Sequence, residues 1–391
     1  MKMINLRNKI FECANYPGMK ILKNAPVCHK GFPNCFNLSF TEYEMINEFG
    51  NYLNYDKNLI FSKIQPCIRH NDWELIIKNN NESYRYLSLF DMAGIGGCIA
   101  LADSKEEQNK ISEYSINTTI KFLIDLGFDI KKIKVTYFSK CLVSKATARK
   151  YNIRKFYPTD LWVNYWKKYY HLKKNQLIID QSRNTMLALN IFGLPTPWGY
   201  RNEILYEYKN KLLDIATIEH LCFSPIFNKN EIVGFNKNKN SMALSVAGVE
   251  RLLMVINNLD NIWEVETISP IINFISKKAV NHNKSHILIA TQAIRVLHRI
   301  FTDCESYSKL QSAHRKMYTR IYAKSFINSL KNLGIKLDLI FLTDLLKLNS
   351  ELQPYYPELH KSLNRAADEI LLRKKAFETD KSIKSGGVAQ K

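Results

Sequence analysis

The chain has 391 residues, a formal net charge of +20 and 46% hydrophobic residues. This length favours two or more domains over a single core, and the hydrophobic content is that of a globular protein. No apolar run approaches the ~18 residues that a membrane-spanning helix needs. The N-terminal stretch lacks the apolar core and the cleavage site of a signal peptide. We therefore expect a cytoplasmic protein without membrane contact.

The positive charge predicts a polyanionic partner such as RNA. An A/T-rich genome would also produce many lysine and asparagine residues, so the charge alone does not decide. The cysteines are scattered and form no CxxC pair, which argues against a zinc site or a disulfide framework and favours reduced thiols. They are Cys13, Cys28, Cys35, Cys67, Cys98, Cys141, Cys222 and Cys304.

Hydrophobic periodicity and turn residues predict the elements in chain order. Residues 1–60 mix short apolar runs with Pro and Gly, and residues 61–104 read as strands and turns. Residues 106–127 read as a helix that Gly127 ends, 131–143 as a strand, and 145–175 as a basic and aromatic segment. Residues 191–245 read as short strands, and the chain from 283 onward reads as helices. We expect an α+β fold with an antiparallel sheet flanked by helices in residues 1–275. A helical domain is expected at 283–378 and a disordered tail at 379–391.

Two common nucleotide-binding motifs are absent from the sequence. It contains no GxxxxGK[ST] loop, which excludes P-loop chemistry at the motif level. The "GIGG" at 94–97 lacks the GxGxxG spacing of a dinucleotide fingerprint.

An arginine precedes a strongly apolar run in "GVERLLMVI", residues 248–256. A buried charge destabilises the fold by several kcal/mol unless an anionic group meets it. Either the neighbouring Glu250 is the partner of Arg251, or the arginine binds an anionic ligand.

Five segments in the same order resemble motifs of the alanyl-tRNA synthetase family of class II aminoacyl-tRNA synthetases. "PCIRHNDW" resembles C-[VI]-R-A-G-G-K-H-N-D-L, and "LFDMAG" resembles F-F-E-M-L-G. "FGLPTPWGYRNEILYE" is similar to M-G-D-T-G-P-C-G-P-C-[ST]-E-I-x-Y-D, "IEHLCFSPIFN" to E-I-W-N-[LI]-V-F-x-Q-[FY]-N, and "SVAGVERLLMVI" to T-G-M-G-L-E-R-x-x-x-V-L. The resemblance covers roughly residues 60–320 and includes no editing domain.

The resemblance implies activation of an amino acid or a related carboxylic acid by ATP and Mg²⁺, giving an acyl-adenylate. It implies catalytic roles for Arg69 on the α-phosphate and Arg251 on the γ-phosphate, because guanidinium groups match phosphate oxygens. The remaining implied contacts are Asp91 and Met92 beside the adenine, Gly248 where the backbone approaches the nucleotide, Glu203 as a magnesium ligand, and Asn190, Glu203, Glu207, His220 and Leu244 around the substrate.

Several of these residues also have a plain structural explanation. Arg251 could simply pair with Glu250 or another surface acid, Arg69 could be an ordinary strand arginine, and Glu203 could be a solvated or hydrogen-bonded carboxylate. His70 reads more readily as a loop histidine than as a catalyst. The aromatic and basic run at 162–174 is typical of a solvated helix as well as of an RNA groove.

The sequence departs from the family pattern on the substrate side. Asn190 stands where the family has the tryptophan of its alanine pocket, and Leu244 stands where the family has the aspartate that holds the ammonium. Loss of that charge-assisted hydrogen bond weakens alanine binding by about 1.5–3 kcal/mol. We therefore expect a different acid, with transfer to tRNA or to a non-standard acceptor such as an amine or a carrier thiol.

Two alternatives stay open at this point. The chain is a catalytically silent RNA-binding paralogue, or the motif matches mislead and it is a basic α+β domain of another role. The presence of both Arg69 and Arg251 favours the ligase, because a silent site needs no phosphate ligands.

Overall fold

The structure is a computed structural model. It describes residues 1–13, 19–29, 36, 58–78, 83–101, 104–137, 161–180, 186–188, 198–229 and 231–386.

Strands of the described residues form one sheet in the order β1-β2-β3-β9-β8-β7-β4-β5, with β6 paired to β7. The strands are β1 (Lys20–Ile21), β2 (Leu59–Ile68), β3 (Leu89–Leu101), β4 (Ile133–Tyr137), β5 (Leu177–Ile179), β6 (Met186–Ala188), β7 (Trp198–Tyr208), β8 (Lys211–Asn228) and β9 (Glu231–Gly248). All pairings are antiparallel except β1 with β2 and β4 with β5. The α+β fold with an antiparallel sheet is thereby confirmed.

A tight turn fixes the register of β7 and β8. Lys209 and Asn210 both have positive φ, 47° and 62°, between the paired residues Tyr208 and Lys211. Two consecutive left-handed residues make a hairpin turn whose twist matches that of the strands, and asparagine tolerates this conformation well. The turn therefore sets which β7 side chains lie opposite which β8 side chains.

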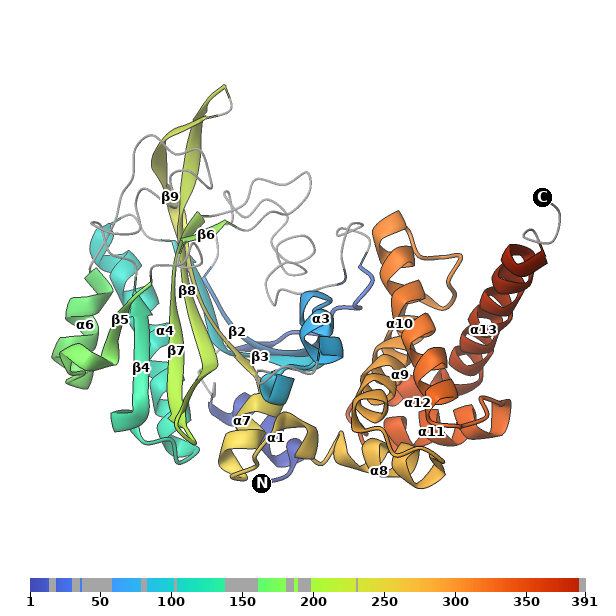
Figure 1. Cartoon of the computed structure of the whole chain (residues 1–391). Helices are drawn as coiled ribbons and strands as arrows, with labels where there is room; N and C mark the ends of the chain where they lie inside the picture. Colours follow the sequence, from blue (N-terminus) through green and yellow to red (C-terminus); the bar gives the residue numbers. More distant parts are fainter. Residues whose placement is uncertain are drawn as a thin grey trace.

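Helices α1 (Met3–Cys13), α4 (Lys105–Asp125) and α7 (Val249–Ile256) pack with one face of the sheet (Figure 1). Ala93, Ile204, Ile218 and Ala247 point into this core. A capping box starts α4, in which the Ser104 hydroxyl accepts from the Glu107 N–H and Glu107 accepts from the Ser104 N–H. This half of the structure also includes α3 (Asn71–Lys78), η2 (Ser83–Arg85), η3 (Ile130–Lys132), α6 (Leu161–Tyr170), η4 (Lys174–Gln176) and η5 (Ile262–Glu264).

The opposite face of the sheet is defined by strand register. Met92 of β3 lies opposite Gly248 of β9. Thr217 of β8 lies between two partners, opposite Val246 of β9 and opposite Glu203 of β7. Directly opposed residues of antiparallel strands share a face, so these five residues lie on one side. We call it the site face.

The C-terminal region is helical, as predicted, and its core is continuous around α9 (Figure 1). Its helices are α8 (Ser269–Lys278), α9 (Lys284–Cys304), α10 (Ala313–Asn332), α11 (Leu339–Glu351), α12 (Pro357–Lys361) and α13 (Leu363–Gly386). Side chains of Asn283, Ser312 and Asp338 accept N–H groups at the starts of α9, α10 and α11. None of the helices in the described ranges has the length and apolar character needed to cross a bilayer.

Three details differ from the expectations drawn from sequence. Ile271 and Ile275 of α8 pack in the same hydrophobic cluster as α9, and this cluster also contains Ile68 and Leu89 of the sheet, so it crosses the boundary expected near residue 275. Helix α13 continues to Gly386, so residues 379–386 are helical where a disordered tail is predicted.

The third difference concerns the cysteines. The structure joins Cys28 and Cys304 in a disulfide, with Cα atoms 6.1 Å apart, so the expectation of reduced thiols is corrected for this pair. The fold brings the segment before β2 to the end of α9, a proximity that spacing along the chain does not reveal. Cys13, Cys67, Cys98 and Cys222 are free thiols.

Candidate functional site

Arg69 lies directly after the last residue of β2, where its N–H donates to the Ser88 carbonyl at 2.8 Å. Its guanidinium lies 5.4 Å from the centre of the Phe90 ring. Asp72 is its ion-pair partner at 4.0 Å, and the Arg69 side chain keeps 42% of its surface exposed. The guanidinium is thus held loosely at the rim of the site face and can contact a ligand.

Arg251 lies in the first turn of α7 and is more tightly held. It donates to the Asp214 carbonyl at 2.6 Å and to the Arg85 carbonyl at 3.2 Å. It also pairs with the Asp214 carboxylate at 2.7 Å, and its side chain is 15% exposed. The anionic partner that the sequence demands is therefore Asp214 on β8, and not the neighbouring Glu250.

Glu250 turns to the opposite side of α7. Its carboxylate accepts the Asp91 N–H at 2.9 and 3.2 Å and lies 3.9 Å from Arg295 of α9. Burial raises the pKa of Glu250, and the nearby Asp91 charge raises it further, while Arg295 opposes the change. Glu250 thus connects β3 and α7 to the helical region.

Strand register brings the two predicted catalytic arginines to one end of the sheet. Arg69 follows Ile68, which pairs with Leu89 at the start of β3, and Arg251 lies three residues after Gly248, which pairs with Met92 near the same end of β3. Burial raises the pKa of Asp72 from 3.8 to about 6, while the charges of Arg69, Arg251 and Arg85 lower it and that of Asp214 raises it. Arg69 and Arg251 therefore lie at the same end of the sheet, although they are far apart in the sequence.

Arg85 completes this group and is missed by the sequence reasoning. It ends η2 and lies 3.8 Å from the Asp214 carboxylate. Its neighbours in "YRYLSLF" give no motif that distinguishes it from a surface arginine. We call Arg69, Arg85 and Arg251, with Asp72 and Asp214 between them, the arginine cluster.

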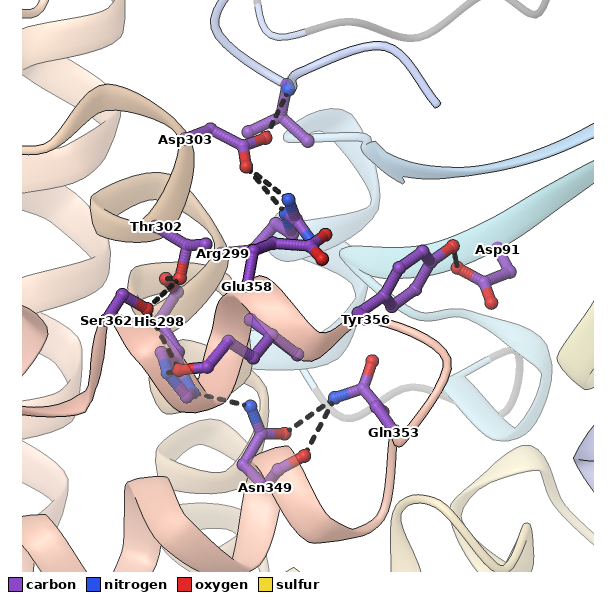
Figure 2. A network of polar contacts seen from close by, with 12 residues as sticks. Asp91, His298, Arg299, Thr302, Asp303, Asn349, Gln353, Tyr356, Glu358 and Ser362 are labelled. Carbon is purple, nitrogen blue, oxygen red and sulfur yellow. Dashed lines mark hydrogen bonds and ion pairs between the residues drawn. The ribbon is translucent and has the colours of Figure 1, made fainter. Parts of the chain in front are cut away.

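Asp91 lies elsewhere than the resemblance implies. Its buried carboxylate pairs with Arg7 of α1. It also accepts the Tyr356 hydroxyl at 2.8 Å (Figure 2). Glu250 accepts its N–H, so the carboxylate and the N–H of Asp91 are both bonded within the protein. Alternation along β3 turns the Asp91 side chain away from the site face, which argues against the adenine contact that the resemblance implies.

Met92 and Gly248 are brought together as expected, opposite each other on β3 and β9. Gly248 has ordinary extended backbone angles, φ −79° and ψ 113°. A Cβ atom built on it would meet only the Cβ of Arg251, at 3.9 Å. The fold itself does not require glycine here, so close approach of a ligand is a better explanation for it.

Glu203 lies on the site face of β7. Its carboxylate accepts the Thr217 hydroxyl at 2.6 Å and pairs with Arg201 at 3.1 Å. Glu207 lies further along β7 and pairs with Lys134 of β4 at 2.5 Å, near the turn of the hairpin. Glu203 is therefore an acid on the site face, while Glu207 joins two strands.

Leu244 is fully buried and lies opposite Glu219 on β8. His220, next in sequence, points to the opposite face, where its Nε2 lies 3.1 Å from Asn202 Oδ1. Burial lowers the pKa of His220 to about 3, so it is neutral in the folded protein. The structure thus separates His220 from Leu244 and Glu203. Asn190 lies outside the described residues.

The sequence is similar to that of a known tRNA ligase. Over 232 residues, 55% of the chain, the sequence is 28% identical to the alanine–tRNA ligase of Buchnera aphidicola subsp. Baizongia pistaciae (strain Bp). The chain is a class II synthetase-like relative. The match spans 26% of that ligase, so this synthetase-like chain corresponds to about a quarter of its curated relative.

The chain was also compared with solved structures and with models of protein families. A pyrrolysyl-tRNA synthetase of Desulfitobacterium hafniense, PylSc, aligns over 67% of this chain and 72% of its own, with 12% identity and a TM-score of 0.33. No protein-family model matches the sequence.

Metal-binding groups are sparse in the synthetase-like chain. Among the described residues, no group of three or more His, Cys, Asp or Glu side chains could hold a metal ion. Mg²⁺ needs only one or two carboxylates when phosphate oxygens supply the other ligands. Glu203 fits this limited role, since it is an acid on the site face.

Proposed function

We propose that this chain activates an amino acid or a related carboxylic acid with ATP, forming an acyl-adenylate and pyrophosphate. Its sequence relationship to a tRNA ligase supports a synthetase-like function. The placement of Arg69 and Arg251 at one end of the sheet, each beside a carboxylate, is the observation that carries the proposal. Adenylate formation requires positioning and neutralisation of phosphate charge, and it needs no covalent enzyme intermediate.

The arginine cluster supplies the phosphate-binding groups of this proposal. Arg69, half-exposed above the Phe90 ring, would contact the α-phosphate. Arg251 would contact the terminal phosphate from the start of α7, with Arg85 as a neighbouring cation. Three guanidinium groups outweigh the two carboxylates between them, so the cluster carries a net positive charge toward a triphosphate.

Phe90 and Met92 would support the adenine, because they lie on the site face between Arg69 and Gly248. The buried contacts of the Asp91 carboxylate with Arg7 and Tyr356 argue against such a role for its side chain. The nucleotide contact would thus rest on an apolar platform, which suits a flat ring.

Glu203 is the proposed magnesium ligand. When bound, Mg²⁺ would neutralise phosphate charge and help to orient the triphosphate. Thr217 and Arg201 hold the Glu203 carboxylate in place, which reduces its freedom before a ligand arrives.

The substrate side would be bounded by Leu244 and Glu219. Leu244 offers no charge to an ammonium group, whereas Glu219 lies directly opposite it on β8. Glu219 is a residue that the sequence reasoning missed, and cross-strand pairing is what brings it to this position. We propose that it takes over part of the role of the aspartate that the family has at position 244.

A pyrophosphate-exchange screen tests the proposal. The full chain, ATP, Mg²⁺ and labelled pyrophosphate are combined with each amino acid and with related carboxylic acids, in the presence and absence of tRNA. Acid-dependent exchange that Arg69→Ala abolishes supports the proposal. Absence of exchange with every acid, in protein that binds ATP, contradicts it.

A catalytically silent RNA-binding paralogue is the second candidate. One observation favours it: Arg251 is already bonded to Asp214 and to two carbonyl groups. This candidate predicts salt-sensitive tRNA binding without ATP-dependent exchange, so the same screen separates the two.

A further inference from the structure

A groove with a volume of about 870 Å³ lies between α10 and α13, and the proposed ATP site does not use it. Met317, Arg320 and Lys324 line it from α10. Another part of α10 carries His314 and Tyr318, whose rings contact His70 beside Arg69. One helix therefore separates the groove from the arginine cluster.

The floor of the groove is apolar. Met317, Ile321 and Phe377 line it, and the Met317 side chain is 45% exposed. Positions 317 and 321 are one helical turn apart, so they form a stripe along α10. An exposed methionine between two aliphatic or aromatic neighbours is adaptable and suits an apolar ligand surface.

The rim of the groove is basic. Its cationic lining residues are Lys316, Arg320, Lys324, Lys331 and Lys374, against one acid, Glu378. Glu378 lies 4.0 Å from Lys374 and is already partly neutralised. Within the described ranges, Arg320 and Lys324 form no ion pair with a carboxylate of the chain. The groove therefore combines an apolar floor with unneutralised positive charge.

The length of the groove sets the size of its occupant. It follows α10 from Ala313 to Lys331, which corresponds to about 27 Å at the helical rise of 1.5 Å per residue. A helix of about five turns has this length.

We propose that this groove binds an acidic amphipathic helix of a protein partner. The apolar stripe of such a helix would cover Met317 and Phe377, and its flanking carboxylates would reach Arg320 and Lys324. Helix-in-groove recognition uses this combination of anchors at helical spacing and charges at the edge. The proposal does not depend on the proposed ligase activity.

The basic rim and the apolar floor of the groove favour an acidic amphipathic helix over a second copy of the chain and over RNA. A second copy of the chain carries a net charge of +20 and would be repelled by a basic rim. Phosphates of an RNA would contact the rim lysines but leave Met317 and Ile321 without an apolar partner. Only a partner that offers both carboxylates and apolar side chains satisfies both parts of the groove.

Two synthetic peptides of identical composition, built from Leu, Glu and Ala, test the proposal. One places the leucines at i, i+3, i+4 and i+7, and the other distributes them around the helix. Fluorescence anisotropy with the full chain should show that the amphipathic peptide binds at least ~10-fold tighter, because its apolar stripe can be buried.

Two variants and a matched control measure separately how the floor and the rim of the groove contribute to peptide affinity. Arg320→Gln/Lys324→Gln should weaken binding roughly fivefold by removing two charge contacts, and Met317→Gln should weaken it by a similar factor through lost apolar area. Lys277→Gln/Lys278→Gln removes the same charge from exposed residues of α8 and should leave affinity unchanged. Thermal unfolding checks that each variant folds.

Three results would overturn the proposal. The first is equal affinity for the two peptides. The second is an equal loss of affinity in the α8 control and in the rim variant. The third is a duplex RNA that displaces the peptide and depends on Arg320 and Lys324 but not on Met317, which would assign the groove to nucleic acid.

Discussion

Glu250 and Arg251 are consecutive residues whose side chains make contacts on different sides of α7. Glu250 accepts the Asp91 N–H at 2.9 Å in a buried contact, and Arg251 pairs with Asp214 at 2.7 Å. Successive helical residues are about 100° apart, so one turn of helix serves two tasks. Glu250 joins the sheet to the helical region, and Arg251 joins the arginine cluster.

Removal of either predicted catalytic arginine should abolish most exchange activity. Arg69→Ala and Arg251→Ala should each lower the rate of pyrophosphate exchange by at least ~100-fold, because each removes a charge from the reacting triphosphate. Arg251→Lys keeps the charge and should retain more activity if the fold survives. Arg365→Ala, at an exposed position of α13 outside the arginine cluster, is the matched control and should leave the rate unchanged. Near-normal exchange in both alanine variants would refute these roles.

Asp72 should make the protein less stable as pH rises through the range from 3.8 to about 6. Its pKa is higher in the folded state than in the unfolded state, so the folded state binds more protons over this interval. The free energy of unfolding therefore falls as pH rises, by about 3 kcal/mol at most, and the loss persists above pH 6.

Asp72→Asn should remove this contribution. Urea unfolding of both proteins between pH 4 and 8 measures it, and the difference between them should grow in favour of the variant up to about pH 6. A difference independent of pH would show that Asp72 keeps its usual pKa.

Asp91→Asn should destabilise the fold by about 3 kcal/mol, because Arg7 is left as a buried charge without its carboxylate. Chemical unfolding measures the loss. The KM for ATP of the folded variant should not change. A raised KM for ATP with unaltered stability would restore the adenine contact that the resemblance implies.

Substrate choice should depend on Leu244. The unmodified protein should use alanine poorly, and Leu244→Asp should raise alanine-dependent exchange while lowering exchange with the native acid. Because Leu244 is fully buried, the aspartate also reduces stability, and Leu244→Asn serves as the uncharged control. Robust exchange with alanine by the unmodified protein would contradict this prediction.

RNA binding should weaken steeply with salt. Lysine and arginine contacts to phosphates release counterions, so tRNA affinity should fall by orders of magnitude between low and physiological salt. We expect the contacts in residues 145–175 and in the helices after 283. Filter binding across a salt series measures the slope, and no tRNA binding even at low salt would favour a tRNA-independent acceptor.

The sequence by itself determined the α+β class, the helical C-terminal region and the placement of Arg69 and Arg251 at element ends. These features depend on local patterns: hydrophobic periodicity, turn residues and the apolar run after Arg251. The order of five motifs added the synthetase resemblance, which the similarity to a tRNA ligase supports.

Only the tertiary structure decided which groups meet. Arg251 contacts Asp214 and Arg85. Asp91 contacts Arg7 and Tyr356. These partners lie in segments that are distant in the sequence. Strand register likewise puts Glu219 opposite Leu244 and turns His220 to the other face. A side chain on a strand changes face with each residue, so its neighbours follow from the pairing of strands and not from the order of letters.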